Sequence, residues 1–434
     1  MSSSESRLRN IGIYRNLPTF SSSVKGLTAI ITGANGISGF NTLRALLDSP
    51  ERWETIYCLS RRPPPDSMMA MLSAEARSRI EVVTCDFLAE PTSIAKSMKE
   101  AGVLADNVFY YSYIHHDWSE SEALVRDNVE LLKNFLQALE LAEIRPSRFT
   151  LQTGGKNYGM HIGRVRTPLL ESDPQPRHLQ PNFYYPQEDL LKAFCERTGS
   201  TWNIIRPAAV IGASTNAGMN MFYDFAIYAA VQAHKGEPLV FGGDWEQWQF
   251  EYYHCTARMT GYLTEWAAVQ KECANEAFNA QDGGPLSYER YFHELARWFG
   301  AKGVVPPPDD ESKLRLVVGK PGKETPLGYG PPLTARQSFS MAEWAKREEN
   351  AAVWSEIMKE SGGKIVNNPF KVDGAFDMAD MGYIRFGSLC LNKARKNGWT
   401  GFVDSLESIF EMYREMEALG MLPAMQVSEP HPLC

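Results

Sequence analysis

The chain has 434 residues, of which 44% are hydrophobic and 22% charged, and its formal net charge is -8. This composition allows a large buried core and excludes extensive disorder, while the negative charge gives no overall basic field that would attract nucleic acid. No stretch of about 20 apolar residues could span a bilayer and no targeting address is recognisable, so we expect a cytoplasmic protein without membrane or nucleic-acid partners.

The seven cysteines are scattered along the chain and never form a close CxxC pair. This spacing is typical of reduced thiols rather than of disulfides or a metal centre, and we predict no metal site. Residues 1–25 are polar and rich in serine, and we expect them to form a flexible N-terminal arm.

From residue 26 onward, short β-branched or aromatic runs alternate with helical patterns, which indicates βαβ units and a mostly parallel sheet. The predicted strands cover residues 28–32, 55–60, 80–84, 107–112, 148–153, 202–206 and 276–280. Residues 118–141 carry apolar side chains at helical spacing and should form a core helix. We therefore predict an α/β fold with a doubly wound Rossmann domain over residues 26–215.

Beyond residue 215 the pattern becomes more helical and aromatic. We expect residues 216–434 to form a mainly helical substrate lobe over the carboxyl edge of the sheet, with a few elements returning to the Rossmann domain. A stretch rich in proline, glycine and charge at 304–332 is predicted to be a surface excursion or mobile insert. No hydrophobic seam distinguishes a monomer from a homodimer, so the sequence leaves both open.

The first predicted strand runs into a glycine-rich turn with the spacing GxxGxxG, directly before a predicted helix. Such a turn lets the backbone approach a pyrophosphate, and the amides at the helix start complement its charge. This spacing favours the short-chain dehydrogenase/reductase type of dinucleotide site. The predicted cofactor contacts in the turn are Gly33, Asn35, Gly36, Ile37 and Gly39.

The second predicted strand ends in Ser60, Arg61 and Arg62, where an NAD site normally places an acidic residue. A carboxylate there would repel a 2′-phosphate, whereas guanidinium groups can bind it through charge-assisted hydrogen bonds. We therefore predict NADPH as the cofactor, and we expect Asp86 and Phe87, after the third strand, beside its adenine ring.

Short-chain reductases usually carry a catalytic tyrosine and lysine four residues apart on one helix. This chain lacks that pair, since Tyr185 begins a predicted helix but Asp189 stands four residues later. A lysine stands instead at the end of the fifth strand, as Lys156 in LQTGGKNYG.

The stretch LQTGGKNYG followed by NFYYPQEDLL resembles the progesterone 5β-reductase and iridoid synthase family of atypical extended short-chain reductases. TGANGISG, CLSRRPPP, VFYYSYI, IIRPAAVIG and SLCLNKARKNGWTGF match further motifs of that family in the same order. The amino-acid sequence is more similar to the fungal or microbial branch of the family than to the plant enzymes.

This resemblance implies an ene-reductase, in which hydride passes from NADPH to the β-carbon of an α,β-unsaturated carbonyl. Tyr185 would donate a hydrogen bond to the developing enolate oxygen, and Lys156 would lower the pKa of that tyrosine or orient the nicotinamide ribose. The implied substrate is a small or medium apolar enone or enal. Of the two consecutive tyrosines we favour Tyr185 over Tyr184, because one of such a pair usually points into the core.

Further contacts are expected where strands end at the cofactor edge. The additional cofactor contacts predicted are Tyr111, Thr153, Pro207, Ala209 and Val210. The residues predicted to line the substrate pocket are Tyr113, Tyr158, His161 and Tyr184.

Two features leave alternatives open. The loop after Lys156 departs from the family pattern at Asn157 and His161, and His254 stands about where extended reductases often place an aspartate. The same tyrosine and lysine would also serve a carbonyl reductase or alcohol dehydrogenase. From another class of protein, the alternative is a non-catalytic NADPH-binding regulator.

Overall fold

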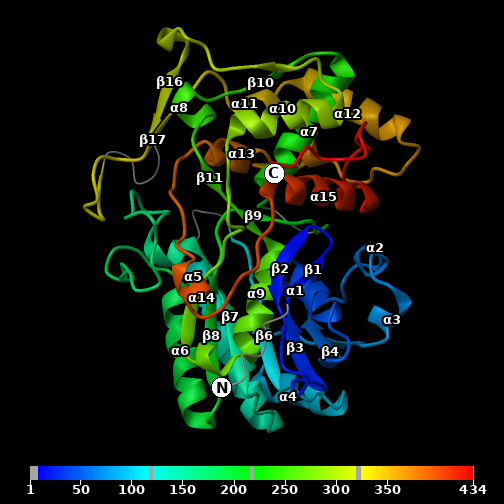
Figure 1. Cartoon of the computed structure of the whole chain (residues 1–434), viewed down its shortest axis with the longest axis vertical. Helices are drawn as coiled ribbons and strands as arrows, with labels where there is room; N and C mark the ends of the chain where they lie inside the picture. Colours follow the sequence, from blue (N-terminus) through cyan, green and yellow to red (C-terminus); the bar gives the residue numbers. More distant parts are fainter. Residues whose placement is uncertain (1–7, 117–120, 216–218, 319–323, 434) are drawn as a thin grey trace.

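The computed structural model describes residues 8–116, 121–215, 219–318 and 324–433. Seven parallel strands form the central sheet in the spatial order β13-β8-β7-β6-β3-β4-β5 (Figure 1). They are β3 Leu27–Thr32, β4 Trp53–Ser60, β5 Ile80–Thr84, β6 Asn107–Tyr110, β7 Arg148–Gln152, β8 Thr201–Arg206 and β13 Glu276–Asn279. The seven predicted strands are confirmed, because short runs of β-branched and aromatic residues mark strands that are covered on both faces.

Helices cover both faces of this sheet, so the fold is doubly wound as predicted (Figure 1). On one face α1 Ile37–Leu47 packs against α9 Ala257–Val269, and on the other lie α4 Pro91–Glu100, α5 Ser121–Ala142 and α6 Tyr184–Thr198. Side chains of β3 alternate between the two cores, with Ile30 on the α5 side and Ile31 on the α1 side. The strand order reverses beside β3, which is the position where open α/β sheets bind ligands.

The C-terminal part of the chain forms a mainly helical lobe above the carboxyl ends of the strands, as predicted (Figure 1). Its helices are α7 Met221–Lys235, α8 Trp245–Trp248, α10 Tyr288–Phe299, α11 Met341–Ala345, α12 Glu348–Glu360, α13 Asp377–Gly382 and α15 Ser405–Ala418, whereas α14 Asn392–Lys396 packs against β13 of the central sheet. Aromatic rings fill the lobe; Phe241, for example, lies 5.2 Å from both Tyr288 and Phe292. Within this part of the sequence, α9 and β13 return to the Rossmann domain.

Part of the N-terminal segment that we predicted to be a flexible arm has regular structure, which corrects that prediction for residues 8–18. β1 Leu8–Ile11 and β2 Tyr14–Pro18 form an antiparallel hairpin. Tyr14 and Leu17 are buried, and the Tyr14 ring lies 5.3 Å from that of Tyr262 on α9. This tertiary contact orders a segment whose own composition is polar. Residues 1–7 of the predicted arm lie outside the described residues.

The insert at 304–332 is also more ordered than a loop. β15 Val304–Val305 pairs with β10 Leu239–Val240, and β16 Arg315–Val318 pairs antiparallel with β17 Thr334–Gln337 in the hairpin at the upper left of Figure 1. The run of β-branched and apolar residues at 316–318 suits a strand, which our prediction of a surface excursion or mobile insert did not include. Residues 319–323 of the insert lie outside the described residues.

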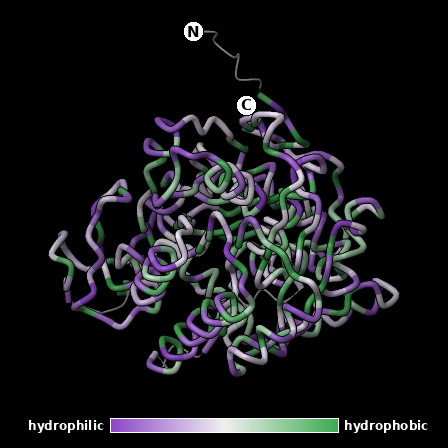
Figure 2. The backbone as a smooth tube through the Cα atoms, turned by 90° about the horizontal axis from the view of Figure 1, so that it is seen from below, coloured by the Kyte–Doolittle hydropathy of each residue, from purple (hydrophilic) through white to green (hydrophobic). Residues whose placement is uncertain are grey.

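The remaining elements are short. They are α2 Asp66–Met69, α3 Ala74–Arg77, β9 Val210–Ile211, β11 Tyr252–Tyr253, β12 Cys255–Thr256 and β14 Pro285–Leu286. Hydrophobic segments run mainly through the interior of the molecule, and the outer loops are largely hydrophilic (Figure 2). Within the described ranges, no helix has both the length and the apolar character that crossing a membrane requires.

Candidate functional site

The carboxyl ends of the parallel strands bring the predicted site residues to one edge of the sheet. The turn after β3 and the loops after β4 and β6 meet there, since Asn35 Nδ2 donates to the Arg62 carbonyl at 2.8 Å and the amide of Tyr111 donates to Thr32 Oγ1 at 3.0 Å. The loops after β7 and β8 meet next to them, joined by a hydrogen bond from Gly155 N to Pro207 O at 3.1 Å.

The turn after β3 is as tight as glycine allows. Gly33 has a φ of +67°, and a Cβ added to it would lie 2.9 Å from the carbonyl oxygen of Tyr111. A Cβ on Gly39 would collide with the carbonyl of Gly33, so the helix packs directly on the turn. Gly36 caps α1 without a side-chain hydrogen bond, which leaves the first helical amides suited to a pyrophosphate. These features fit a dinucleotide.

The loop after β4 is held beside this turn. Ser60 Oγ donates to the carbonyl oxygen of Arg62 at 2.5 Å, and the same oxygen accepts the bond from Asn35. The side chains of Arg61 and Arg62 are exposed. Arg61 and Arg62 therefore stand next to the glycine turn with their side chains exposed to solvent.

After β5, the two predicted adenine neighbours differ in their surroundings. Asp86 is exposed and its carboxylate accepts a hydrogen bond from Leu88 N at 3.0 Å. Phe87 is only 3% exposed, and its ring packs 4.8 Å from that of Phe135 on α5. The Phe87 ring therefore belongs to the core, so the predicted position beside the adenine ring would involve its backbone and not its side chain.

Tyr111, after β6, likewise turns its side chain away from the site. Its hydroxyl accepts a hydrogen bond from Thr42 Oγ1 on α1 at 2.8 Å, and burial raises the pKa of this phenol to about 12. What Tyr111 contributes to the edge is its carbonyl, which lies against Gly33. The predicted cofactor contact can therefore come only from the backbone.

Lys156 lies in the short 3₁₀ helix Gly155–Tyr158 that follows β7 and Thr153. Its carbonyl accepts a hydrogen bond from Asn182 Nδ2 at 2.9 Å, which fixes the loop to the start of α6. The lysine is half-buried, and desolvation lowers the pKa of its ammonium group. The end of β7, just before this loop, also contacts α1, because Gln152 Nε2 donates to Ser38 Oγ at 2.8 Å.

The two tyrosines in the first turn of α6 have different surroundings. Tyr185 is 3% exposed, and its hydroxyl donates to the carbonyl oxygen of Asn157 at 3.1 Å. Tyr184 is half-buried, and its hydroxyl lies 3.3 Å from where a Cβ on Gly154 would be. Burial raises the pKa of both phenols. Only Tyr184 therefore has its hydroxyl beside the backbone that leads into Lys156.

The residues predicted to line a substrate pocket separate into two groups. Tyr113 is 39% exposed, and its ring lies 5.8 Å from Phe183, whose ring is 4.6 Å from Tyr184. These three rings form an aromatic wall. His161 also lies close to the site, since burial and then the charge of Lys156 lower the pKa of its imidazole to about 4.

Tyr158 belongs to the interior instead, which corrects the prediction that it lines the pocket. It is 4% exposed, its hydroxyl donates to Asn279 Oδ1 at 2.5 Å, and that hydroxyl accepts a bond from Arg206 Nη1 at 3.3 Å.

The loop that follows β8 is fixed between the lysine loop and β12. The amide of Ala208 lies 3.1 Å from Cys255 Sγ, and the carbonyl of Ala209, which has a φ of +50°, accepts a bond from Cys255 N. Val210 then begins β9.

One charged residue at this edge escaped the sequence reasoning. Glu188 is 1% exposed, and its Oε1 lies 3.0 Å from Nη2 of the buried Arg206. The signal was its position in NFYYPQEDLL: Glu188 stands four residues after Tyr184, where a usual short-chain reductase carries its lysine.

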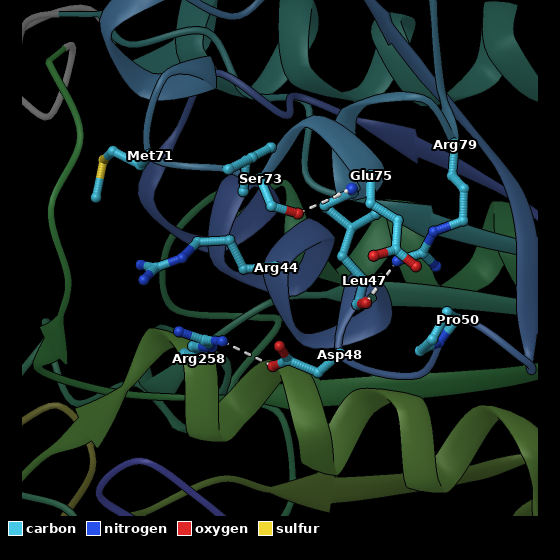
Figure 3. Close-up of a pocket in the computed structure, with 11 residues that line it drawn as sticks. Arg44, Leu47, Asp48, Pro50, Met71, Ser73, Glu75, Arg79 and Arg258 are labelled. Atoms are coloured by element: carbon cyan, nitrogen blue, oxygen red, sulfur yellow. Dashed lines mark hydrogen bonds and ion pairs between the residues drawn. The ribbon is translucent and has the colours of Figure 1, made fainter.

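A cleft of about 320 Å³ lies elsewhere, at the amino ends of the strands (Figure 3). Its position follows from Arg79, which precedes β5 and donates to the carbonyl of Trp53 at the start of β4. Its other arginines are already paired, Arg258 with Asp48 at 2.7 Å and Arg44 with Glu415 at 2.6 Å. Because it opens at the edge opposite Lys156, this cleft is not the candidate site. Among the residues that the structure describes, no group of three or more His, Cys, Asp or Glu could hold a metal ion.

Comparison with known proteins bears on this site. The model of the PRISE-like Rossmann-fold domain matches residues 29–318. A short chain dehydrogenase of Penicillium aethiopicum is 30% identical over 402 residues, which cover 91% of this chain and 99% of that protein. A 3-oxo-Delta(4,5)-steroid 5-beta-reductase of Arabidopsis thaliana is 27% identical over 403 residues, covering 91% and 93%. Among solved structures, an epimerase of Methanothermobacter thermautotrophicus shares the fold, with a TM-score of 0.51 and 18% identity over 66% of this chain and 81% of that one.

Proposed function

Because the chain belongs to the PRISE-like Rossmann-fold family and is an oxidoreductase of the short-chain dehydrogenase/reductase type, we propose that it is an NADPH-dependent ene-reductase. The family was identified correctly from its lysine and NFYY motifs. The proposed reaction delivers hydride to the β-carbon of an α,β-unsaturated carbonyl, and a proton from solvent then completes the α-carbon. The name of the Arabidopsis relative, a reductase of Δ(4,5) 3-oxo steroids, describes a substrate of this class.

We propose NADPH rather than NADH because of the loop after β4. The glycine turn and the uncapped start of α1 suit a pyrophosphate, and the exposed Arg61 and Arg62 suit the 2′-phosphate that distinguishes the two cofactors. When bound, the nicotinamide supplies the hydride. In this proposal residues 26–215 hold the cofactor, and residues 216–434 cover the substrate.

The observation that supports the proposal is the position of the Tyr184 hydroxyl. It lies 3.3 Å from a Cβ built on Gly154, and Gly154 stands two residues before Lys156 in the chain. We propose Tyr184, and not Tyr185 as we first expected, as the hydrogen-bond donor to the enolate oxygen. The hydroxyl of Tyr185 already donates to Asn157, whereas Tyr184 is half-buried and, with its raised pKa, keeps its proton at neutral pH. One such donor is worth about 3 kcal/mol in the transition state.

Lys156, two residues after Gly154 in the chain, would add positive charge near this hydroxyl. An ammonium group near the phenol favours the developing negative charge and can also hold the nicotinamide ribose. The aromatic wall of Tyr113, Phe183 and Tyr184, together with a His161 that is neutral at pH 7, favours an apolar rather than an anionic substrate.

The test is NADPH oxidation, followed by absorbance, against a panel of enals, enones and ketones, with deuteride-labelled cofactor and analysis of the product. Deuterium at the β-carbon is the expected result. Deuterium on the carbonyl carbon would replace the proposal by carbonyl reduction. Tight NADPH binding without oxidation of any substrate would instead favour the non-catalytic regulator.

A further inference from the structure

The lysine and the tyrosine of this site stand on different elements of the fold. Lys156 belongs to the 3₁₀ helix after β7, and Tyr184 begins α6. When both groups lie four residues apart on one helix, the helix itself fixes their separation. Here the separation depends on whatever connects the two elements, and a shift of about 1 Å between reacting groups can cost a factor of 100 in rate.

A buried ion pair joins α6 to the end of β8, next to the loop that carries Lys156. Glu188, one turn after Tyr184 on α6, has its Oε1 3.0 Å from Nη2 of Arg206 at the end of β8. The two residues are 1% and 5% exposed. Glu188 Oε2 also accepts a hydrogen bond from Gln175 Nε2 at 3.0 Å, so both of its oxygens are held.

The pair also contacts the two residues that follow Lys156. The side-chain amide of Asn157 lies 3.2 Å from Glu188 Oε1 and 3.3 Å from Arg206 Nη1. The hydroxyl of Tyr158 accepts from Arg206 Nη1 at 3.3 Å, and the guanidinium lies 5.3 Å from the Tyr158 ring centre. One ion pair therefore joins the helix that carries the tyrosine to the loop that carries the lysine.

We propose that Glu188 and Arg206 are positioning residues that set the distance between the Tyr184 hydroxyl and the Lys156 ammonium. The pair fixes the separation that a shared helix fixes in usual short-chain reductases. Glu188 stands four residues after Tyr184, the sequence position at which those enzymes carry their lysine. The expected effect of the pair on catalysis rests on the proposed function. The contacts by which the pair joins the loop to α6 do not.

The chain offers a matched control. Glu265 on α9 is also 1% exposed and pairs with the buried Arg52, which precedes β4 at the opposite edge of the sheet. Glu188→Gln and Glu265→Gln each leave one buried arginine without its counter-ion, and each should lower the thermal unfolding temperature. Only Glu188→Gln should lower kcat, by about 10- to 100-fold, with the Kd for NADPH unchanged. Equal kcat values in Glu188→Gln and wild type, or equal losses in both variants, would overturn the inference.

A double variant separates position from stability. Glu188→Gln combined with Arg206→Met removes the ionic link without leaving an unpaired buried charge, so the unfolding temperature should recover relative to the single variant. We expect kcat to stay low, because the ionic link is lost and only the hydrogen bonds from Asn182 to Lys156 and from Tyr185 to Asn157 still join the loop to the helix. Recovery of kcat together with stability would show that the pair serves folding alone.

Hydrogen exchange gives a readout that does not need turnover. With NADPH present, the amides of 155–158 should exchange faster in Glu188→Gln than in wild type and should be unaffected in Glu265→Gln. Unchanged exchange at 155–158 would contradict the inference while leaving the proposed function standing. Conversely, a wild-type protein that reduces no enone refutes the proposed function, and the exchange rates still decide whether the ion pair holds the loop.

Discussion

The hydroxyl of Tyr185 donates to the carbonyl oxygen of Asn157 across 3.1 Å, and so ties the first turn of α6 to the residue after Lys156. Tyr184, beside it, keeps its hydroxyl next to Gly154. A variant pair tests what each tyrosine does. Tyr184→Phe should lower kcat by about 100-fold and leave NADPH affinity intact, because it removes a donor to developing charge.

Tyr185→Phe is the matched comparison for the same experiment. It removes one buried hydrogen bond and leaves the Asn157 carbonyl without that donor, which should cost about 1 kcal/mol in the free energy of unfolding. Steady-state kinetics and chemical unfolding of the two variants separate these effects. If Tyr185→Phe loses turnover and Tyr184→Phe keeps it, the donor is Tyr185.

The arginines after β4 should decide which cofactor binds. In the double variant Arg61→Ala/Arg62→Ala the Kd for NADPH should rise by about 10- to 100-fold, since each hydrogen bond to a charged phosphate is worth roughly 1.5–3 kcal/mol. The Kd for NADH should hardly change. Fluorescence titration with both cofactors measures the ratio, and equal weakening for NADPH and NADH would assign the arginines a role other than 2′-phosphate recognition.

Alanine substitutions at two glycines of the same turn should differ in their effect on the stability of the protein without cofactor. A Cβ at Gly36 would lie 3.6 Å from its nearest neighbour, the Gly33 carbonyl oxygen, which is an ordinary contact. Gly36→Ala should therefore keep the unfolding temperature and weaken NADPH binding. Gly39→Ala would drive a methyl group into the Gly33 carbonyl and should destabilise the domain itself. Differential scanning calorimetry with and without NADPH distinguishes the two cases.

The sheet was predictable because its strands are local in sequence. Ile30 and Ile31 in β3 are both fully buried, one on each face, and such runs read as strands without knowledge of their neighbours. The N-terminal hairpin was missed for the opposite reason. Its two short strands are held by Tyr14 and Leu17 against α9, more than 200 residues further along the chain, and no local pattern reveals that contact.

The candidate site divides along the same line. Gly33, Gly39 and Lys156 could be located from motifs, and their roles remain predictions. The choice between Tyr184 and Tyr185 depends on how α6 is rotated against the lysine loop, which the sequence does not state. Glu188 was missed because its meaning comes from Arg206, a partner on β8 that only the fold brings within 3.0 Å.

His254 should make the protein sensitive to acid. It is 5% exposed, and burial lowers the pKa of its imidazole from 6.5 to about 4. A depressed pKa contributes stability that is present above pH 6.5 and is lost as the pH falls through 4, here about 3 kcal/mol in total. His254→Gln should therefore lose less stability than wild type between pH 7 and pH 4.5 in urea unfolding.

Asp282 lies nearby and also makes stability depend on pH. The effect of His254 is therefore measured as the difference between wild type and His254→Gln at each pH. Its amide donates to the His254 carbonyl at 2.9 Å, and burial raises the pKa of its carboxyl to about 7. A raised carboxyl pKa acts in the opposite direction, because its stabilising effect is lost as the pH rises through 7. The same pH dependence in wild type and His254→Gln would mean that His254 does not titrate in this range.

The insert at 304–332 should influence which substrates are accepted, because part of it contacts the loop after Lys156. Leu327 packs against the buried cluster that contains Tyr158, Val165 and Leu169, and its two methyl groups lie 3.3 Å from where a Cβ on Gly159 would be. Arg164 Nε donates to the Pro331 carbonyl at 3.0 Å, which holds the insert on that loop. Shortening Leu327 removes apolar surface beside the loop after Lys156 and leaves the aromatic wall unchanged.

Leu327→Ala should raise the KM for bulky apolar enones by about 10-fold, the effect of roughly 1–3 kcal/mol from lost apolar contact, and should change kcat little. Leu316→Ala is the control, since Leu316 stands on β16 of the same insert with 64% of its surface exposed. Kinetics with a graded series of alkyl enones should show the rise in KM only for Leu327→Ala and only for the longer substrates. A uniform rise for all substrates would indicate that Leu327 supports the position of the lysine loop instead of contacting substrate.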